Sequence, residues 1–100
     1  MKVAYTTALR TSSEAERITA VAGRGEDVDV VLDDPGVSRR HAEIRVTADG
    51  PRLIAQIRDL GSTNGTRLNG SPVRESGMLA DAVISAGTTD FVFRVIAKSV

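Results

Sequence analysis

The segment HAEIRVTADGPRLIAQI, residues 41–57, indicates the fold because apolar side chains recur in it at every second position. These residues lie on both sides of a turn signal at Asp49-Gly50-Pro51 and are Ala42, Ile44, Val46, Leu53, Ala55 and Ile57. An alternation of period two is typical of a strand with one face in the core and the other in solvent. The same pattern recurs in three further runs, at 18–22, 28–32 and 91–97. We therefore predict several short strands.

Turn signals separate these runs at short intervals. The clearest are Asp34-Pro35-Gly36 and the Asn-Gly pairs at 64–65 and 69–70. Asn-Gly is favoured where both central residues of a turn need a positive φ, because glycine has no Cβ and asparagine tolerates this conformation. One helix-like stretch, at 12–17, is too short and too polar to form a core helix. Many short strands with such turns predict an all-β sandwich or barrel.

Composition limits the possible functions. The 100 residues suit one small domain, and 13 basic and 13 acidic residues give a net charge of zero. Proteins that bind nucleic acid usually carry a basic surplus or stripe, so this class is disfavoured. The chain has no cysteine and one histidine, which excludes disulfides and a closed metal site. We expect no cofactor. Because no apolar run could span a bilayer and no secretory signal pattern is present, we expect a cytoplasmic protein without membrane insertion.

Three segments at turns carry the candidate function: GR at 23–24, VSRRHAEI at 37–44 and DLGSTNGTRLNG at 59–70. A phosphate monoester has about −1.5 to −2 charges near pH 7 and three strong acceptor oxygens. Arginine can bond two of these oxygens at once, a serine hydroxyl and loop amides can bond the others, and asparagine can bond a flanking peptide backbone. Acidic residues lie between the arginines, so an anion site here must be a local pocket rather than a broad basic face.

In order, spacing and letters these segments resemble the forkhead-associated (FHA) family, whose pattern is Gly-Arg, then Ser-x-x-His, then an Asn and an Asn-Gly. The resemblance covers roughly residues 20–95, and the sequence is similar to actinobacterial FHA proteins. It implies an FHA-type β-sandwich of two antiparallel sheets, with the binding loops at one end. Residues 1–100 would then form a single FHA domain, one module of a longer protein.

The resemblance also implies a function and a set of site residues. The domain would be a phosphothreonine-dependent protein–protein interaction module in Ser/Thr kinase signalling, without enzymatic activity. Its partner would be a threonine-phosphorylated protein, either a Ser/Thr kinase or a kinase substrate. Binding roles fall on Arg24 and Ser38 (phosphate), Arg39 (a second cationic contact), Thr63 (the phosphothreonine pocket) and Asn64 (the peptide main chain). Supporting roles fall on Gly23, His41, Gly65 and Asn69.

Two other functions remain open. The chain could be a scaffold that binds a partner through a sandwich face without phosphate, although the presence of Arg24, Ser38 and Asn64 counts against this. It could also be a small hydrolase with Ser38 as nucleophile and His41 as base. No acid partner, nucleophile elbow or oxyanion motif accompanies that pair, so the hydrolase is disfavoured.

Two stretches depart from the family pattern. Residues 20–23 read AVAG, where the family often has an isoleucine before Gly-Arg. Ala80 and Ala82 stand where a glycine and an aspartate are common, or else Asp81 is shifted by one position. We expect a local irregularity in the turn before the strand that follows, without loss of binding.

Overall fold

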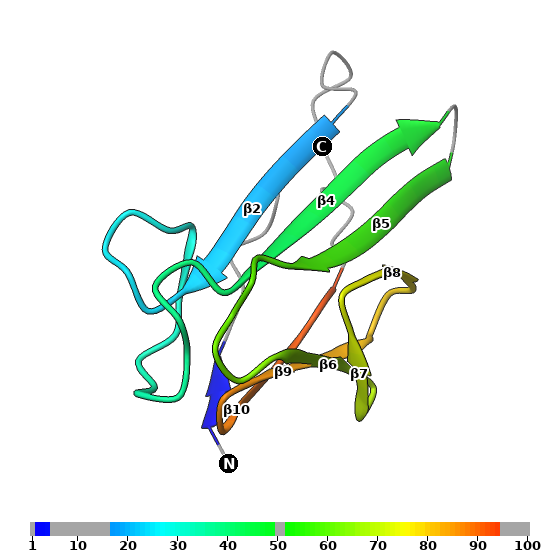
Figure 1. The fold of residues 1–100 in the computed structure, drawn as a ribbon. Coiled ribbons are helices and arrows are strands. Elements are labelled where there is room, and N and C mark those ends of the chain that lie inside the picture. Colours follow the sequence, from blue (N-terminus) through cyan, green and yellow to red (C-terminus); the bar gives the residue numbers. More distant parts are fainter. Residues whose placement is uncertain (1, 5–16, 50–51, 95–100) are drawn as a thin grey trace.

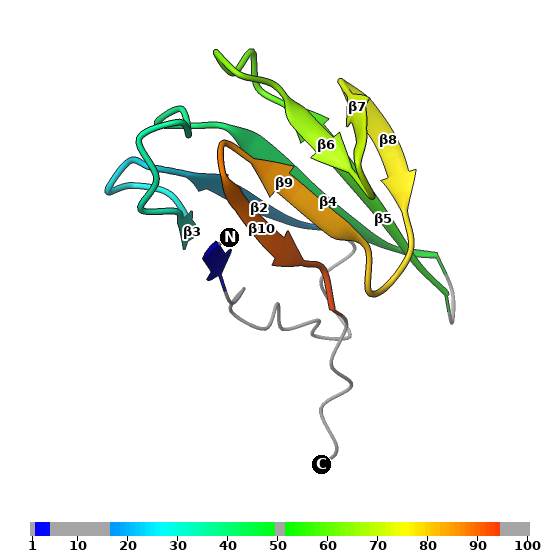
Figure 2. The same ribbon diagram turned by 90° about the horizontal axis from the view of Figure 1, so that it is seen from below.

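In the computed structural model, which describes residues 2–4, 17–49 and 52–94, two sheets of five strands pack into a β-sandwich (Figures 1 and 2). The strands are β1 (Lys2–Ala4), β2 (Arg17–Gly23), β3 (Val30–Val31), β4 (Ala42–Asp49), β5 (Arg52–Asp59), β6 (Thr66–Leu68), β7 (Ser71–Val73), β8 (Glu75–Met78), β9 (Val83–Ala86) and β10 (Thr89–Val92). Within these residues no helix could cross a membrane. The predicted all-β sandwich is confirmed. Most of the helix-like stretch at 12–17 lies outside the described residues, and its last residue begins β2.

The strand order is β1-β10-β9-β6-β7 in one sheet and β3-β2-β4-β5-β8 in the other. Most neighbours are antiparallel, but β1 pairs with β10 and β3 pairs with β2 in parallel. The two sheets are thus antiparallel, as predicted, apart from one parallel edge strand in each. At the β3 edge, the loop after β2 curls back so that the Asp29 amide donates to the Val21 carbonyl, at 2.9 Å. The Val21 amide in turn donates to the Asp29 carboxylate, at 2.8 Å.

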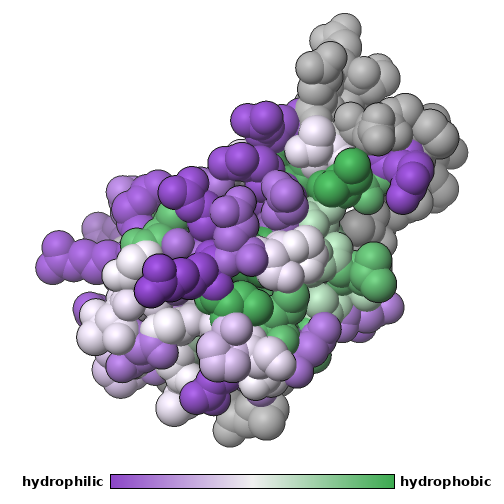
Figure 3. Space-filling view, turned by 45° about the vertical axis from the view of Figure 1, so that its right-hand side comes forward, coloured by the Kyte–Doolittle hydropathy of each residue, from purple (hydrophilic) through white to green (hydrophobic). Residues whose placement is uncertain are grey.

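The core lies between the sheets and uses the alternating residues that the sequence predicts. Side chains from both sheets meet in one cluster, in which Ile57, Ile84 and Phe91 are completely buried. The prediction is wrong at the start of β5, where Leu53 is exposed together with Ile54. The register of β5 with β8 begins only at Ala55, so its first residues extend beyond that neighbour. Figure 3 shows apolar surface in the middle and right of the view, whereas hydrophilic residues predominate on its left.

The turn before β9 has the expected irregularity. Asp81 adopts a φ of 69°, a left-handed conformation that is uncommon for residues other than glycine. Its amide donates to the carbonyl of Phe93 at 2.7 Å, and the Phe93 amide donates to Ala82 at 2.9 Å. The chain thus makes a tight turn without the glycine that the family often has there.

Asp34 joins the two sheets at the loop end of the sandwich. Its carboxylate is buried and accepts hydrogen bonds from the Thr89 hydroxyl, from the amide and hydroxyl of Thr88, and from the Gly36 amide. The threonines follow β9, while Asp34 and Gly36 belong to the loop between β3 and β4. The bonds from Thr89, Gly36 and Thr88 outweigh the effect of burial and lower the pKa of Asp34 well below its usual range.

This pKa predicts how stability responds to acid. A carboxyl whose pKa is lower in the folded than in the unfolded chain stabilises the fold above its unfolded pKa, and this contribution is lost as the pH falls. We expect the melting temperature to fall as the pH drops below about 4, near the ordinary pKa of aspartate. Asp34→Asn should melt lower at neutral pH and show a flatter acid response. Thermal melts from neutral to acid pH test this, and equal acid slopes for the two proteins would contradict it.

Candidate functional site

Main-chain hydrogen bonds next to Gly23 join the loop that follows β2 to the segment that precedes β4. The Arg24 amide donates to the Ser38 carbonyl at 3.0 Å, and the Gly25 amide donates to the Arg39 carbonyl at 3.1 Å. A Cβ on Gly23 would overlap the carbonyl oxygen of Arg39. Only glycine permits this close approach, which places Arg24 directly beside Ser38.

The guanidinium of Arg24 is oriented by one hydrogen bond. Its Nε donates to the carbonyl of Val37 at 3.0 Å, and the side chain is otherwise exposed. Within the described residues its two terminal nitrogens make no hydrogen bond or ion pair. Arg24 therefore presents a fork of donors whose direction is fixed before any ligand arrives.

A hollow of about 490 Å³ opens beside this fork. Arg24 and Arg39 line it together with Glu26 and Asp27. The neighbouring Arg40 lies with its Nη1 3.9 Å from a carboxylate oxygen of Asp27. Arg39 thus lines the same hollow as Arg24, and the nearby acids confine the positive charge to a small region.

His41 connects the loop between β3 and β4 to the loop between β5 and β6. It is completely buried, its Nδ1 accepts from the Ser38 amide at 3.0 Å, and its Nε2 lies 2.8 Å from the carbonyl of Gly65. An amide can only donate and a carbonyl can only accept, so these partners require the neutral tautomer with its proton on Nε2. Both ring nitrogens are occupied by main-chain groups. The Ser38 hydroxyl therefore has no base in His41.

The loop between β5 and β6 contacts the loop between β3 and β4 through two further hydrogen bonds. The amide of Thr63 donates to the Ser38 Oγ at 3.0 Å, and the Asn64 Nδ2 donates to the Gly36 carbonyl at 2.9 Å. These contacts bring all five predicted binding residues to one end of the sandwich, where Figure 1 shows the two loops side by side. They are Arg24, Ser38, Arg39, Thr63 and Asn64.

The two Asn-Gly pairs have different conformations. Asn69 and Gly70 both have a positive φ, of 50° and 86°, as expected for this turn. In the other pair only Gly65 does, at 83°, because the Asn64 side chain reaches across to the opposite loop. Asn69 does not join the loop cluster: its amide and its Oδ1 bond the carbonyl and the amide of Val83.

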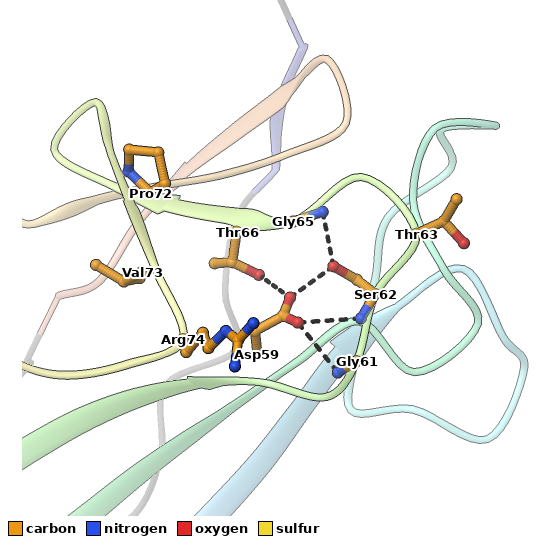
Figure 4. Close-up of a pocket in the computed structure, with 9 residues that line it drawn as sticks. All are labelled: Asp59, Gly61, Ser62, Thr63, Gly65, Thr66, Pro72, Val73 and Arg74. Carbon is orange, nitrogen blue, oxygen red and sulfur yellow. Dashed lines mark hydrogen bonds between the residues drawn. The ribbon is translucent and has the colours of Figure 1, made fainter.

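Asp59 organises the second loop and was not predicted from the sequence. Its carboxylate accepts from the amides of Gly61 and Ser62 and from the hydroxyls of Ser62 and Thr66 (Figure 4). The Ser62 Oγ also accepts from the Gly65 amide at 2.9 Å. Partial burial acts to raise the pKa of Asp59, but the bonds from Ser62 and Thr66 outweigh it and keep the pKa below its usual value. An aspartate followed three residues later by serine was a local signal of this turn.

Asp34 is the second residue that sequence reasoning missed. The Asp34-Pro35-Gly36 segment predicted a turn, but not that its carboxylate anchors the loop to Thr88 and Thr89.

Among the described residues no group of histidine and acidic side chains could hold a metal ion. The site consists of hydrogen-bond donors on three loops, which follow β2, β3 and β5 and are joined by hydrogen bonds. This arrangement suits an anion.

Comparison with known proteins agrees with this arrangement. A family model described as FHA domain matches residues 20–87. The FHA domain-containing protein FhaA of Mycobacterium tuberculosis is 44% identical over 75 residues, which cover 75% of this chain and 14% of that protein. The glycogen accumulation regulator GarA of Mycolicibacterium smegmatis is 44% identical over 82 residues, 81% of this chain and 49% of that protein. The chain thus spans less than half the length of either relative.

Solved structures share the fold. One, from a structural and functional analysis of phosphothreonine-dependent FHA domain interactions, is 40% identical with a TM-score of 0.68. The match covers 80% of this chain and 79% of that one.

The close approach at Gly23 generates a stability prediction. Gly23→Ala forces a methyl group against the Arg39 carbonyl, and we expect it to destabilise the fold by about 1–3 kcal/mol, as overpacking typically does. Gly77→Ala is the matched control, since a Cβ there would meet only the Ala55 carbonyl, at 3.9 Å. Chemical denaturation measures both. Equal loss of stability in the two variants would show that the approach at Gly23 is not tight.

Proposed function

Since the chain belongs to the forkhead-associated (FHA) domain family, we propose that it binds a threonine-phosphorylated segment of a partner protein and catalyses no reaction. The observation that carries this proposal is the pair of unengaged terminal nitrogens of Arg24, a residue whose amide bonds the Ser38 carbonyl. A phosphate dianion needs several strong donors in a fixed geometry. These residues supply them at one point.

Each loop contributes to the phosphate contact. Arg24 would bond two phosphate oxygens, and Arg39 would add a second positive charge from the same hollow. The Ser38 oxygen already accepts from the Thr63 amide, so its hydrogen is available to donate to phosphate. Because the loops are tied together before binding, little conformational entropy would be lost on association.

Asn64 and Thr63 would contact the rest of the ligand. The Asn64 Nδ2 bonds the Gly36 carbonyl, which fixes the amide and leaves its Oδ1 to accept from a ligand main-chain N–H. Thr63 is exposed beside Ser38 and would line the space for the phosphothreonine methyl group. Gly23, His41 and Gly65 would support the site by holding the two loops. Asn69 would act at a distance, by fixing the turn between β6 and β7 to β9.

The two alternatives have less support. A hydrolase needs a base for Ser38, and both nitrogens of His41 bond main-chain groups instead. A scaffold that binds without phosphate would not require the guanidinium of Arg24 to be held in a fixed orientation. The relative GarA is named a regulator, which fits a binding module rather than an enzyme.

We extend the proposal to the whole protein. Residues 1–100 would form one FHA domain of a longer chain, because the relatives are longer than the matched region. The partner would be a Ser/Thr protein kinase or a substrate of one, and the location cytoplasmic, where ATP-dependent kinases act on such substrates.

Arg24→Ala tests the placement of the phosphate. Loss of a bidentate charged contact should weaken phosphothreonine peptide binding at least about a hundredfold, since each charge-assisted bond contributes about 1.5–3 kcal/mol. The fold should be unchanged because the side chain is exposed. Arg52→Ala removes the same charge at the far end of β5 and should bind as the parent does. Titration calorimetry at fixed salt measures all three proteins.

The ligands for this experiment are a phosphothreonine peptide pool, the same pool without phosphate, and a phosphoserine pool. The unphosphorylated pool should not bind, and phosphoserine should bind about fivefold more weakly, because it lacks the methyl group. Unchanged affinity in Arg24→Ala, or equal binding of the unphosphorylated pool, would refute the proposed function.

A further inference from the structure

A second depression lies beside the loop between β5 and β6, on the side that faces β7 (Figure 4). We call it the groove. Its volume is about 660 Å³, and the lining residues that matter for its chemistry are Ser62, Thr63, Thr66, Pro72, Val73 and Arg74. None of the phosphate-binding arginines reaches it, so its role is separate from that of the hollow at Arg24 and Arg39.

The groove and the proposed phosphate site lie on the same loop, and Thr63 belongs to both. The amide of Thr63 bonds the Ser38 Oγ in the phosphate site, and the same residue lines the groove. An extended peptide advances about 3.3 Å per residue, so the residues next to a bound phosphothreonine reach beyond Thr63 within a few positions. A side chain that flanks a phosphothreonine bound at Ser38 is therefore within reach of the groove.

Among the described residues, the groove has one charged side chain without a hydrogen bond or ion pair. The carboxylate of Asp59 at its floor is saturated by four hydrogen bonds from the loop. Arg74 is exposed, and within the described residues its side chain has no hydrogen bond or ion pair. The adjacent Glu75 is the register partner of Arg58 on β5. The charge in the groove that lacks a partner is therefore positive.

We propose that the groove binds an anionic side chain of the same phosphothreonine segment, with Arg74 as its partner; this rests on the proposed function. The guanidinium of Arg74 bonds the ligand carboxylate, while Pro72 and Val73 contact the methylene groups of the same side chain. The site thus reads two anions on one peptide, the phosphate at Arg24 and an acidic residue at Arg74. Acidic residues flanking the phosphothreonine become a determinant of specificity.

The experiment uses phosphothreonine peptide pools with either glutamate or glutamine fixed at one flanking position at a time. Affinities are measured for the parent, Arg74→Ala, Arg74→Lys and the control Arg52→Ala. The parent should prefer glutamate over glutamine about three- to fivefold at one or more positions, as for a partly exposed ion pair. Arg74→Ala should lose this preference without weaker binding of the glutamine pools. Arg74→Lys should keep part of it, and Arg52→Ala all of it.

The outcomes separate this inference from the function on which it rests. If the parent shows no preference for glutamate, or if Arg74→Ala keeps the preference, the groove does not read an acidic residue while phosphothreonine binding stands. If the parent binds none of the phosphorylated pools, both proposals fail. A glutamate preference that disappears only in Arg74→Ala supports the assignment, because the double-mutant comparison isolates the pair.

Discussion

The imidazole of His41 is the contact on which both loops depend. It is completely buried, and its two nitrogens bond the Ser38 amide and the Gly65 carbonyl, which lie on different loops. A buried donor or acceptor that loses its partner destabilises the fold by about 1–3 kcal/mol. Movement of either loop away from the ring is therefore unfavourable. The ring therefore sets the distance between the loops, and this distance determines where Ser38 and Thr63 meet.

Two carboxylates complete the framework that His41 begins. Asp59 collects the donors of its own loop, and Asp34 fastens the other loop to the threonines that follow β9. The pKa of each carboxyl lies below its usual value because these hydrogen bonds stabilise the charged form. The side chains of Arg24, Arg39, Thr63 and Asn64 are exposed, whereas His41 and Asp34 are buried. Affinity in such a site comes from donors that need no rearrangement when the phosphate arrives.

Sequence patterns predicted most of the strands, but not the contacts that hold the loops in place. Alternating residues such as Ile44 and Ile57 identify strands because burial on one face imposes a period of two. The motif at 37–44 could predict a phosphate-binding loop because its residues are close together in the sequence. Asp34 bonds residues 54 and 55 positions away, and no local pattern indicates such a partner. The link from Asn64 to Gly36 depends in the same way on tertiary structure.

We infer that the site is formed before ligand binds, and backbone order in the free protein tests this most directly. Nitrogen-15 relaxation of the Ser38, Thr63 and Gly65 amides reports motion on the picosecond to nanosecond timescale. The network predicts order parameters of about 0.85 for these amides, like those of a rigid backbone, with little change when a phosphothreonine peptide is added. Values below about 0.6 in the free protein that rise on binding would contradict the account, because the ligand would then be ordering the loops.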